Sequence, residues 1–167
     1  GYKYDGRQKV IAEALIEEYK LKDNARILDV GCGKGFLLYE FQKLLPNAEL
    51  WGMDISEYGL KESPADLDAT LIPHKAQDKF SWNNGYLDLV ISLGCLHNLK
   101  MRDLHKALRE IDRVGKQKYV MVESYRNEQE QFNLQCWALT AETELDNESW
   151  IWLFDYFGYT GDYEFIY

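Results

Sequence analysis

Short apolar runs alternate along the chain with segments in which apolar residues recur every three or four positions. The runs predict β-strands, and the longer period predicts amphipathic helices. Strands are predicted at residues 26–30, 49–54, 69–76, 87–93, 118–123 and 163–167. Helices are predicted at residues 10–19, 37–45, 55–63, 102–114 and 147–157.

Strand and helix alternate through the first five strands, which is the pattern of a parallel sheet built with right-handed crossovers. We therefore expect an α/β fold with a doubly wound, mostly parallel sheet and helices on both faces. The length fits one domain, so residues 1–167 are predicted to fold as a unit. Residues 1–24 are expected to form an N-terminal cap segment. The polar residues 124–145 are expected to form a substrate lid over the carboxyl edge of the sheet.

The first strand runs directly into a loop with a glycine at every second position, which is followed by a helix. The stretch reads Ile27-Leu-Asp-Val-Gly-Cys-Gly-Lys-Gly35. Glycine allows the chain to turn sharply and lets a ligand lie against the backbone. The N–H groups at the start of the next helix would then face that ligand. The pattern predicts a nucleotide-type pocket. A dinucleotide loop would need glycine where this chain has Phe36, and no G-x-x-x-x-G-K-[ST] run occurs.

This stretch resembles the first motif of the class I, Rossmann-like S-adenosylmethionine-dependent methyltransferases, hydrophobic-L-D-x-G-C-G-x-G. The resemblance implies S-adenosylmethionine as the cofactor and methyl transfer as the activity. An acidic residue at the end of the second strand, Asp54, is placed to accept hydrogen bonds from ribose hydroxyls. It would also serve as a cap for the following helix. The cofactor contacts implied in these two regions are Asp29, Gly31, Cys32, Gly33, Gly35, Asp54 and Ile55.

Further cofactor contacts implied by the resemblance come from later strand ends and from the N-terminus. The family usually has G-D-A after its third strand, where this chain reads His74-Lys75-Ala76. Gln77 or Asp78 would then bond the adenine amino group, unless these residues are a plain surface loop. The remaining expected contacts are Ala76, Leu93 at the end of the fourth strand, and Arg7, which with Tyr4 would reach the methionine carboxylate or the substrate. The family normally ends in a two-stranded antiparallel addition. Only one such strand is evident, so either this edge is reduced or the chain is shortened.

Three residues are candidates for removing a proton from a methyl acceptor. His97 lies in Leu96-His97-Asn98-Leu99, which resembles an L-H-x-L sequence of many relatives, and imidazole has an unperturbed pKa near 6.5. A purely structural role for His97 is the alternative. Glu123 and Tyr125, after the fifth strand, are the next candidates. Tyr2, Tyr4, Tyr125 and Trp137 lie in the segments expected to cover the pocket, where their aromatic faces would attract a cation such as the sulfonium or an amine substrate.

Charge, cysteine content and hydropathy indicate the kind of partner and the location of the protein. The formal net charge of −9 argues against a nucleic-acid partner, because phosphate binding needs clustered Lys and Arg. Three widely spaced cysteines indicate reduced thiols in a cytoplasmic protein, with no metal site. No apolar run approaches the roughly 20 residues that span a bilayer.

Together these features predict a methyltransferase that acts on an oxygen or nitrogen of a small-molecule metabolite, as a monomer or homodimer. The alternatives are a protein or RNA methyltransferase, and a non-catalytic domain that binds the cofactor and regulates another protein.

Overall fold

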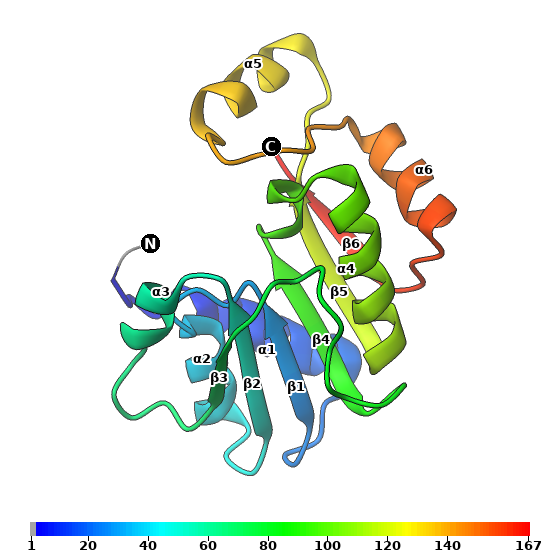
Figure 1. The fold of residues 1–167 in the computed structure, drawn as a ribbon. Helices are drawn as coiled ribbons and strands as arrows, with labels where there is room; N and C mark the ends of the chain where they lie inside the picture. Colours follow the sequence, from blue (N-terminus) through cyan, green and yellow to red (C-terminus); the bar gives the residue numbers. More distant parts are fainter. Residues whose placement is uncertain (1–2) are drawn as a thin grey trace.

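The computed structural model describes residues 3–167, which form a parallel six-stranded sheet with helices on both faces (Figure 1). The strands lie side by side in the order β3-β2-β1-β4-β5-β6, and every neighbouring pair runs parallel. The strands are β1 (Arg26–Val30), β2 (Glu49–Asp54), β3 (Thr70–Pro73), β4 (Leu87–Leu93), β5 (Gly115–Glu123) and β6 (Asp162–Ile166). The doubly wound α/β prediction is confirmed.

Helices of different parts of the chain cover the two faces of the sheet. The helices are α1 (Gln8–Tyr19), α2 (Phe36–Leu44), α3 (Glu57–Lys61), α4 (Met101–Val114), α5 (Glu128–Trp137) and α6 (Asn147–Phe157), with a 3₁₀ turn η1 (Leu96–Asn98) after β4. In β1, Ile27 packs into a core with α1 and α2, while its neighbour Leu28 packs into the core with α4 and α6. Successive side chains of a strand point to opposite faces, so this buried strand supplies both cores.

Local capping explains where two of the helices begin. The side chain of Ser56 accepts a hydrogen bond from the backbone N–H of Gly59 and starts α3. The side chain of Asp146 accepts one from the N–H of Ser149 and starts α6, which ends at Gly158 in the left-handed region. These polar caps satisfy N–H groups that a helix leaves without partners in its first turn. Both helix starts agree with the sequence prediction.

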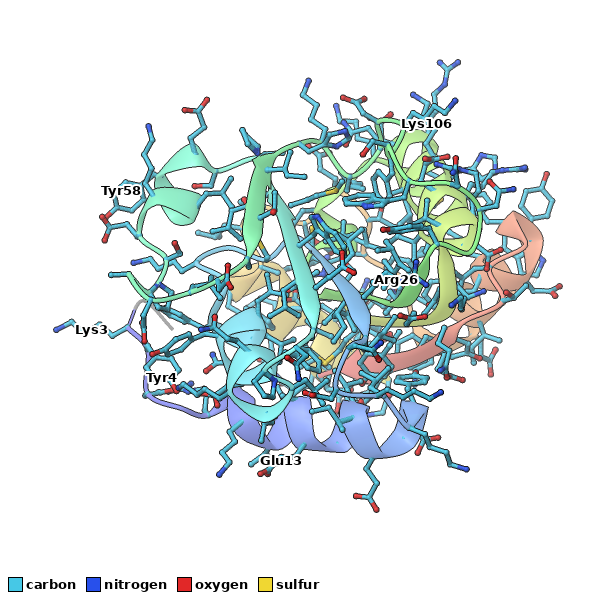
Figure 2. The ribbon with its side chains drawn as sticks, turned by 90° about the horizontal axis from the view of Figure 1, so that it is seen from below. Lys3, Tyr4, Glu13, Arg26, Tyr58 and Lys106 are labelled. Atoms are coloured by element: carbon cyan, nitrogen blue, oxygen red, sulfur yellow. The ribbon has the colours of Figure 1, made fainter. Side chains whose placement is uncertain are left out.

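The N-terminal segment is held against α2. The ring of Tyr4 packs edge-on against Phe36 and Tyr39, and its hydroxyl hydrogen-bonds to Glu40 and Lys43. Figure 2, which views the molecule from below, shows Tyr4 on this segment beside α2. Tyr2, expected to cover the pocket, lies outside the described residues.

Several elements differ from the sequence prediction. Strand β3 ends at Pro73, three residues before its predicted end at residue 76. Helix α5 was not predicted, because its apolar residues show no helical period; Leu134 is the one buried side chain within it. Strand β5 starts three residues earlier than predicted, and its first residue, Gly115, pairs with Leu87 of β4. A β-carbon on Gly115 would lie 2.9 Å from Val90 Cγ2, so glycine permits the close approach. The last strand, β6, pairs with β5 in parallel, and so differs from the antiparallel addition in which the family normally ends.

No helix in residues 3–167 has both the length and the apolar character that crossing a bilayer requires.

Candidate functional site

The glycine loop between β1 and α2 turns back over the end of β2. Gly31, Gly33 and Gly35 all have positive φ angles, of 84°, 54° and 69°. The N–H groups of Gly31 and Cys32 donate to the carbonyl of Met53, at 2.7 and 3.0 Å, and so tie the loop to β2. A β-carbon at position 31 would lie 2.5 Å from Cys95 Cβ, so close packing requires glycine there. At Gly33 a β-carbon would meet nothing within 4 Å.

Asp54, at the carboxyl end of β2, holds the glycine loop and the start of α3 together. Its Oδ2 accepts a hydrogen bond of 2.8 Å from the N–H of Gly33, and its Oδ1 accepts one of 2.8 Å from the N–H of Ser56. A carboxylate oxygen accepts more than one hydrogen bond. Both oxygens therefore keep capacity for the hydroxyls of a ligand.

Asp29 is a buried carboxyl group two residues before Gly31. It is 4% exposed, and its Oδ1 has no hydrogen-bond partner among the described residues. Burial, and to a smaller degree the nearby charge of Asp54, raise the pKa of Asp29 to about 7. A carboxyl group with this pKa is only partly ionised at neutral pH, and a positively charged ligand nearby would favour its ionised form.

A cavity of about 400 Å³ opens at the carboxyl ends of β1, β2 and β4. Ligands of open α/β sheets bind at this edge. Five of the predicted cofactor contacts line it: Gly31, Asp54, Ile55, Ala76 and Gln77. A cavity of about 510 Å³ lies at the other end of the strands, between ionic side chains such as Arg26 and Asp88, away from the glycine loop.

The other predicted cofactor contacts lie outside the cavity wall. Asp29, in β1, and Gly33 and Gly35, in the glycine loop itself, do not line the cavity, and the sulfur of Cys32 faces Gly52 of β2. Arg7 is exposed and pairs with Asp5 at the start of α1. Asp78 and Leu93 lie beside lining residues, but they do not line the cavity themselves. For the adenine contact left open between Gln77 and Asp78, the structure brings only Gln77 to the cavity.

The predicted catalytic residues His97 and Glu123 form a buried pair that does not line the cavity, although the residue after His97, Asn98, does. His97 comes from η1 and Glu123 from the end of β5; His97 Nε2 and Glu123 Oε2 lie 3.2 Å apart without hydrogen-bond alignment. Burial lowers the pKa of His97 to about 4 and raises the pKa of Glu123. His97 is therefore unprotonated at neutral pH. Tyr125, the third candidate, is half-buried and pairs with Asp146 in an isolated parallel bridge.

Several residues on the cavity wall were missed from the sequence. Asn98, Leu99 and Thr140 line it together with Cys95, whose thiol has a pKa raised to about 12 by burial. Asn98 is the x position of the L-H-x-L sequence, so this sequence is the signal from which Asn98 could have been predicted. No motif in the sequence around Thr140 indicates that it lines the cavity, because its place depends on how the segment after α5 returns to the sheet.

These residues fit an adenosine-type cofactor with a cationic end. The glycine loop leaves open space where a side chain at Gly33 would lie, Asp54 offers acceptor oxygens at the rim, and the unpaired oxygen of Asp29 favours positive charge. Within the described residues, no group of His, Cys, Asp and Glu side chains is arranged to hold a metal ion.

Comparison with known proteins agrees with this geometry. Residues 27–118 match the family described as a methyltransferase domain. Protein-lysine N-methyltransferase EFM4 of Saccharomyces cerevisiae is 30% identical over 106 residues, which are 58% of this chain and 46% of the yeast protein. Malonyl-[acyl-carrier protein] O-methyltransferase of Legionella pneumophila is 34% identical over 113 residues, which are 64% of this chain and 39% of that protein.

Among solved structures, an S-adenosylmethionine-dependent methyltransferase of Aquifex aeolicus superposes with a TM-score of 0.55. Its identity is 23%, and the match covers 68% of this chain and 63% of that one. The chain spans less than half the length of the two curated relatives. The family match covers more than half of the chain and includes the glycine loop, Asp54 and the strands that form the cavity. The chain therefore belongs to the methyltransferase domain family, with the fold of the class I S-adenosylmethionine-dependent methyltransferases.

Proposed function

We propose that the protein transfers a methyl group from S-adenosylmethionine to an oxygen or nitrogen of a small-molecule metabolite. The observation that carries the proposal is the hydrogen bond between Asp54 and the N–H of Gly33, which joins the glycine loop to an acidic strand end beside one cavity. Loop backbone and carboxylate together suit a nucleoside with ribose hydroxyls.

The side chains that would hold the cofactor divide by the chemistry they offer. Asp54 would accept hydrogen bonds from the ribose hydroxyls, and Gln77 would bond the adenine amino group. Ile55 and Ala76 offer apolar surface to the adenine ring. Asp29 would balance the positive charge of the methionine end. Leu93, at the end of β4, is a further proposed contact of the cofactor. Arg7 would reach the carboxylate of the methionine end only if its ion pair with Asp5 were broken.

Bound S-adenosylmethionine supplies a methyl group already activated by a positively charged sulfur. The protein therefore has to orient the acceptor, exclude water and accept a proton. Orientation alone is worth up to roughly 7–11 kcal/mol in favourable cases. The segment of residues 124–145, which leaves the sheet at the end of β5, is our proposed cover for the acceptor.

We assign the proton acceptor to the His97–Glu123 pair, with Tyr125 as the next candidate. Because His97 is unprotonated at neutral pH, it is in the form that accepts a proton, although its lowered pKa makes it a weak base. If Nε2 carries the hydrogen that faces Glu123, Nδ1 is the accepting nitrogen. Nδ1 has no hydrogen-bond partner among the described residues. Glu123 would orient the ring only if the two side chains turned into hydrogen-bond alignment.

The acidic surface supports a small acceptor over RNA, since the net charge is −9. A protein acceptor is the second candidate, and the yeast relative, named as a protein-lysine methyltransferase, favours it. A non-catalytic cofactor-binding domain is the third. The free thiols of Cys32, Cys95 and Cys136 support a cytoplasmic location.

Isothermal titration with S-adenosylmethionine, S-adenosylhomocysteine and, as a control, NAD tests the cofactor. We expect micromolar binding of the first two and none of NAD. Transfer of labelled methyl groups to fractionated metabolites, compared with transfer to protein and RNA fractions, then tests the acceptor class. Binding without transfer to any fraction would favour the non-catalytic domain, and absence of binding would overturn the proposal.

A further inference from the structure

The segment between β5 and α6 stands off the body of the protein, above the carboxyl edge of the sheet (Figure 1). We call residues 126–146 the cap. Within α5, which makes up half of it, Leu134 is the one buried side chain, while Phe132 and Trp137 are 62% and 54% exposed. Outside α5, Leu145 at the end of the cap packs against the core, so little apolar burial fixes α5 and the limb that precedes Leu145. The position of this part of the cap depends on polar contacts.

The limb of the cap that returns from α5 to the sheet makes four hydrogen bonds with the loop after β4. The N–H groups of Glu142 and Thr143 both donate to the carbonyl of His97, at 3.0 Å. The hydroxyl of Thr143 donates to the carbonyl of Leu99, at 2.7 Å. The hydroxyl of Thr140 donates to the side-chain oxygen of Asn98, also at 2.7 Å.

The Asn98–Thr140 contact differs from the other three because both of its side chains line the cavity. Thr143, in contrast, is 5% exposed and lies away from the cavity wall. The amide nitrogen of Asn98 also donates to the carbonyl of Cys95, at 3.1 Å. The side chain of Cys95 packs against Gly31 of the glycine loop. One asparagine therefore connects the glycine loop, the loop after β4 and the cap.

We propose that the Asn98–Thr140 hydrogen bond is a latch that holds the cap closed over the cavity, and that a cavity ligand leaves when this bond opens. Thr140 is a positioning residue in this arrangement, since it acts through Asn98. A single neutral hydrogen bond on an exposed residue is worth little net free energy, because water replaces it. The latch therefore opens often enough to allow exchange of the ligand, while the three hydrogen bonds of Glu142 and Thr143 keep the limb attached to the loop after β4.

Three substitutions separate the latch from ordinary support of the fold. Thr140→Val keeps the shape of the side chain and removes the hydroxyl, whereas Thr140→Ser keeps the hydroxyl. Thr143→Val is the matched control, because it removes a hydroxyl of equal hydrogen-bond length from the same limb, away from the cavity. Thermal unfolding of each variant reports whether the fold as a whole is weakened.

The first readout is amide hydrogen exchange of residues 128–139 in the protein without cofactor. We expect Thr140→Val to speed exchange there about threefold to tenfold, as loss of one hydrogen bond implies, with little change in melting temperature. Thr140→Ser should exchange like the wild type. Thr143→Val should lower the melting temperature, because its hydroxyl is buried, without the same increase in cap exchange.

The second readout, which rests on the proposed function, is the release rate of S-adenosylhomocysteine. We expect Thr140→Val to speed release severalfold and Thr140→Ser to restore it. Wild-type exchange in Thr140→Val, equal behaviour of the Val and Ser variants, or equal acceleration in Thr143→Val would each overturn the latch. If the wild type binds no S-adenosylhomocysteine, the proposed function fails, and the exchange comparison still decides on the latch.

Discussion

His97 Nε2 lies 3.2 Å from Glu123 Oε2, and the two side chains are buried together between the loop after β4 and the end of β5. Apart from each other, His97 and Glu123 have no charged partner at ion-pair distance among the described residues. Burial disfavours both charged forms, so it lowers the pKa of the imidazole and raises the pKa of the carboxyl group. The pair therefore makes the stability of the fold depend on pH.

The lowered pKa of His97 predicts a loss of stability in mild acid. Below pH 6.5 the unfolded chain binds a proton that the folded chain refuses until about pH 4. The free energy of unfolding therefore falls as the pH drops through this window, by up to about 3 kcal/mol. Thermal or urea unfolding from pH 8 to pH 4 measures it. His97→Gln should show a smaller fall, and the raised pKa of Glu123 acts in the opposite direction in both proteins. Parallel curves for wild type and variant would contradict the assignment.

Asp54→Asn should weaken binding of S-adenosylmethionine and S-adenosylhomocysteine by about 1.5–3 kcal/mol, because hydrogen bonds to a charged acceptor are lost. The asparagine keeps one oxygen for the N–H of Gly33 and loses the hydrogen bond from Ser56. The N–H groups of Gly31 and Cys32 still tie the loop to β2, so the fold should persist. Asp66→Asn is the control, since Asp66 accepts a hydrogen bond from Tyr39 outside the cavity. Titration calorimetry gives both affinities. Unchanged affinity in folded Asp54→Asn protein would remove Asp54 from the ribose site.

Two glycines of the same loop should respond differently to alanine. Gly31→Ala places a β-carbon against Cys95 and strains a φ of 84°, whereas Gly33→Ala adds a β-carbon in open space at a φ of 54°. We expect Gly33→Ala to cost about 1–2 kcal/mol from its backbone conformation alone. Gly31→Ala should cost about 1–3 kcal/mol more through overpacking. Urea unfolding without cofactor compares them, and equal losses would show that Cys95 moves aside freely.

Gln77 and Asp78 are both candidates for the adenine contact, and of the two only Gln77 lines the cavity. We expect Gln77→Ala to weaken cofactor binding by about 0.5–1.5 kcal/mol, the net value of one hydrogen bond. Asp78→Ala should leave the affinity unchanged. Calorimetric titration of the two variants side by side tests this, and the reverse order would mean that the loop after β3 moves when the cofactor binds.

Burial of Asp29 predicts a pH effect of the opposite sign to that of His97. Its carboxyl group keeps its proton in the folded chain up to about pH 7, while the unfolded chain releases it near pH 4. Stability therefore falls as the pH rises through this window, by up to about 4 kcal/mol. Asp29→Asn has no carboxyl proton to lose. Its advantage in free energy of unfolding over the wild type should therefore be larger at pH 8 than at pH 5. An advantage that does not change with pH would show that Asp29 is ionised in the folded protein.

The sequence by itself determined the order of the elements other than α5 and the short η1 turn, and the position of the glycine loop. Strand β4 was predicted at its observed bounds, and Ser56 caps its helix as expected, because apolar periodicity and capping chemistry act over a few neighbouring residues. The acid at the end of β2 was found for the same reason, since strand ends follow from local pattern. The resemblance in the glycine loop then indicated the cofactor.

Only the tertiary structure decided which side chains meet at the cavity. Thr140 and Asn98 are 42 residues apart, and His97 and Glu123 come from different elements, so no local pattern could pair them. Helix α5 has no apolar period of its own, and its place follows from hydrogen bonds of its returning limb. Sequence periodicity reports which face of an element is buried. The partners across a cavity depend on how separate elements pack, which is a property of the whole fold.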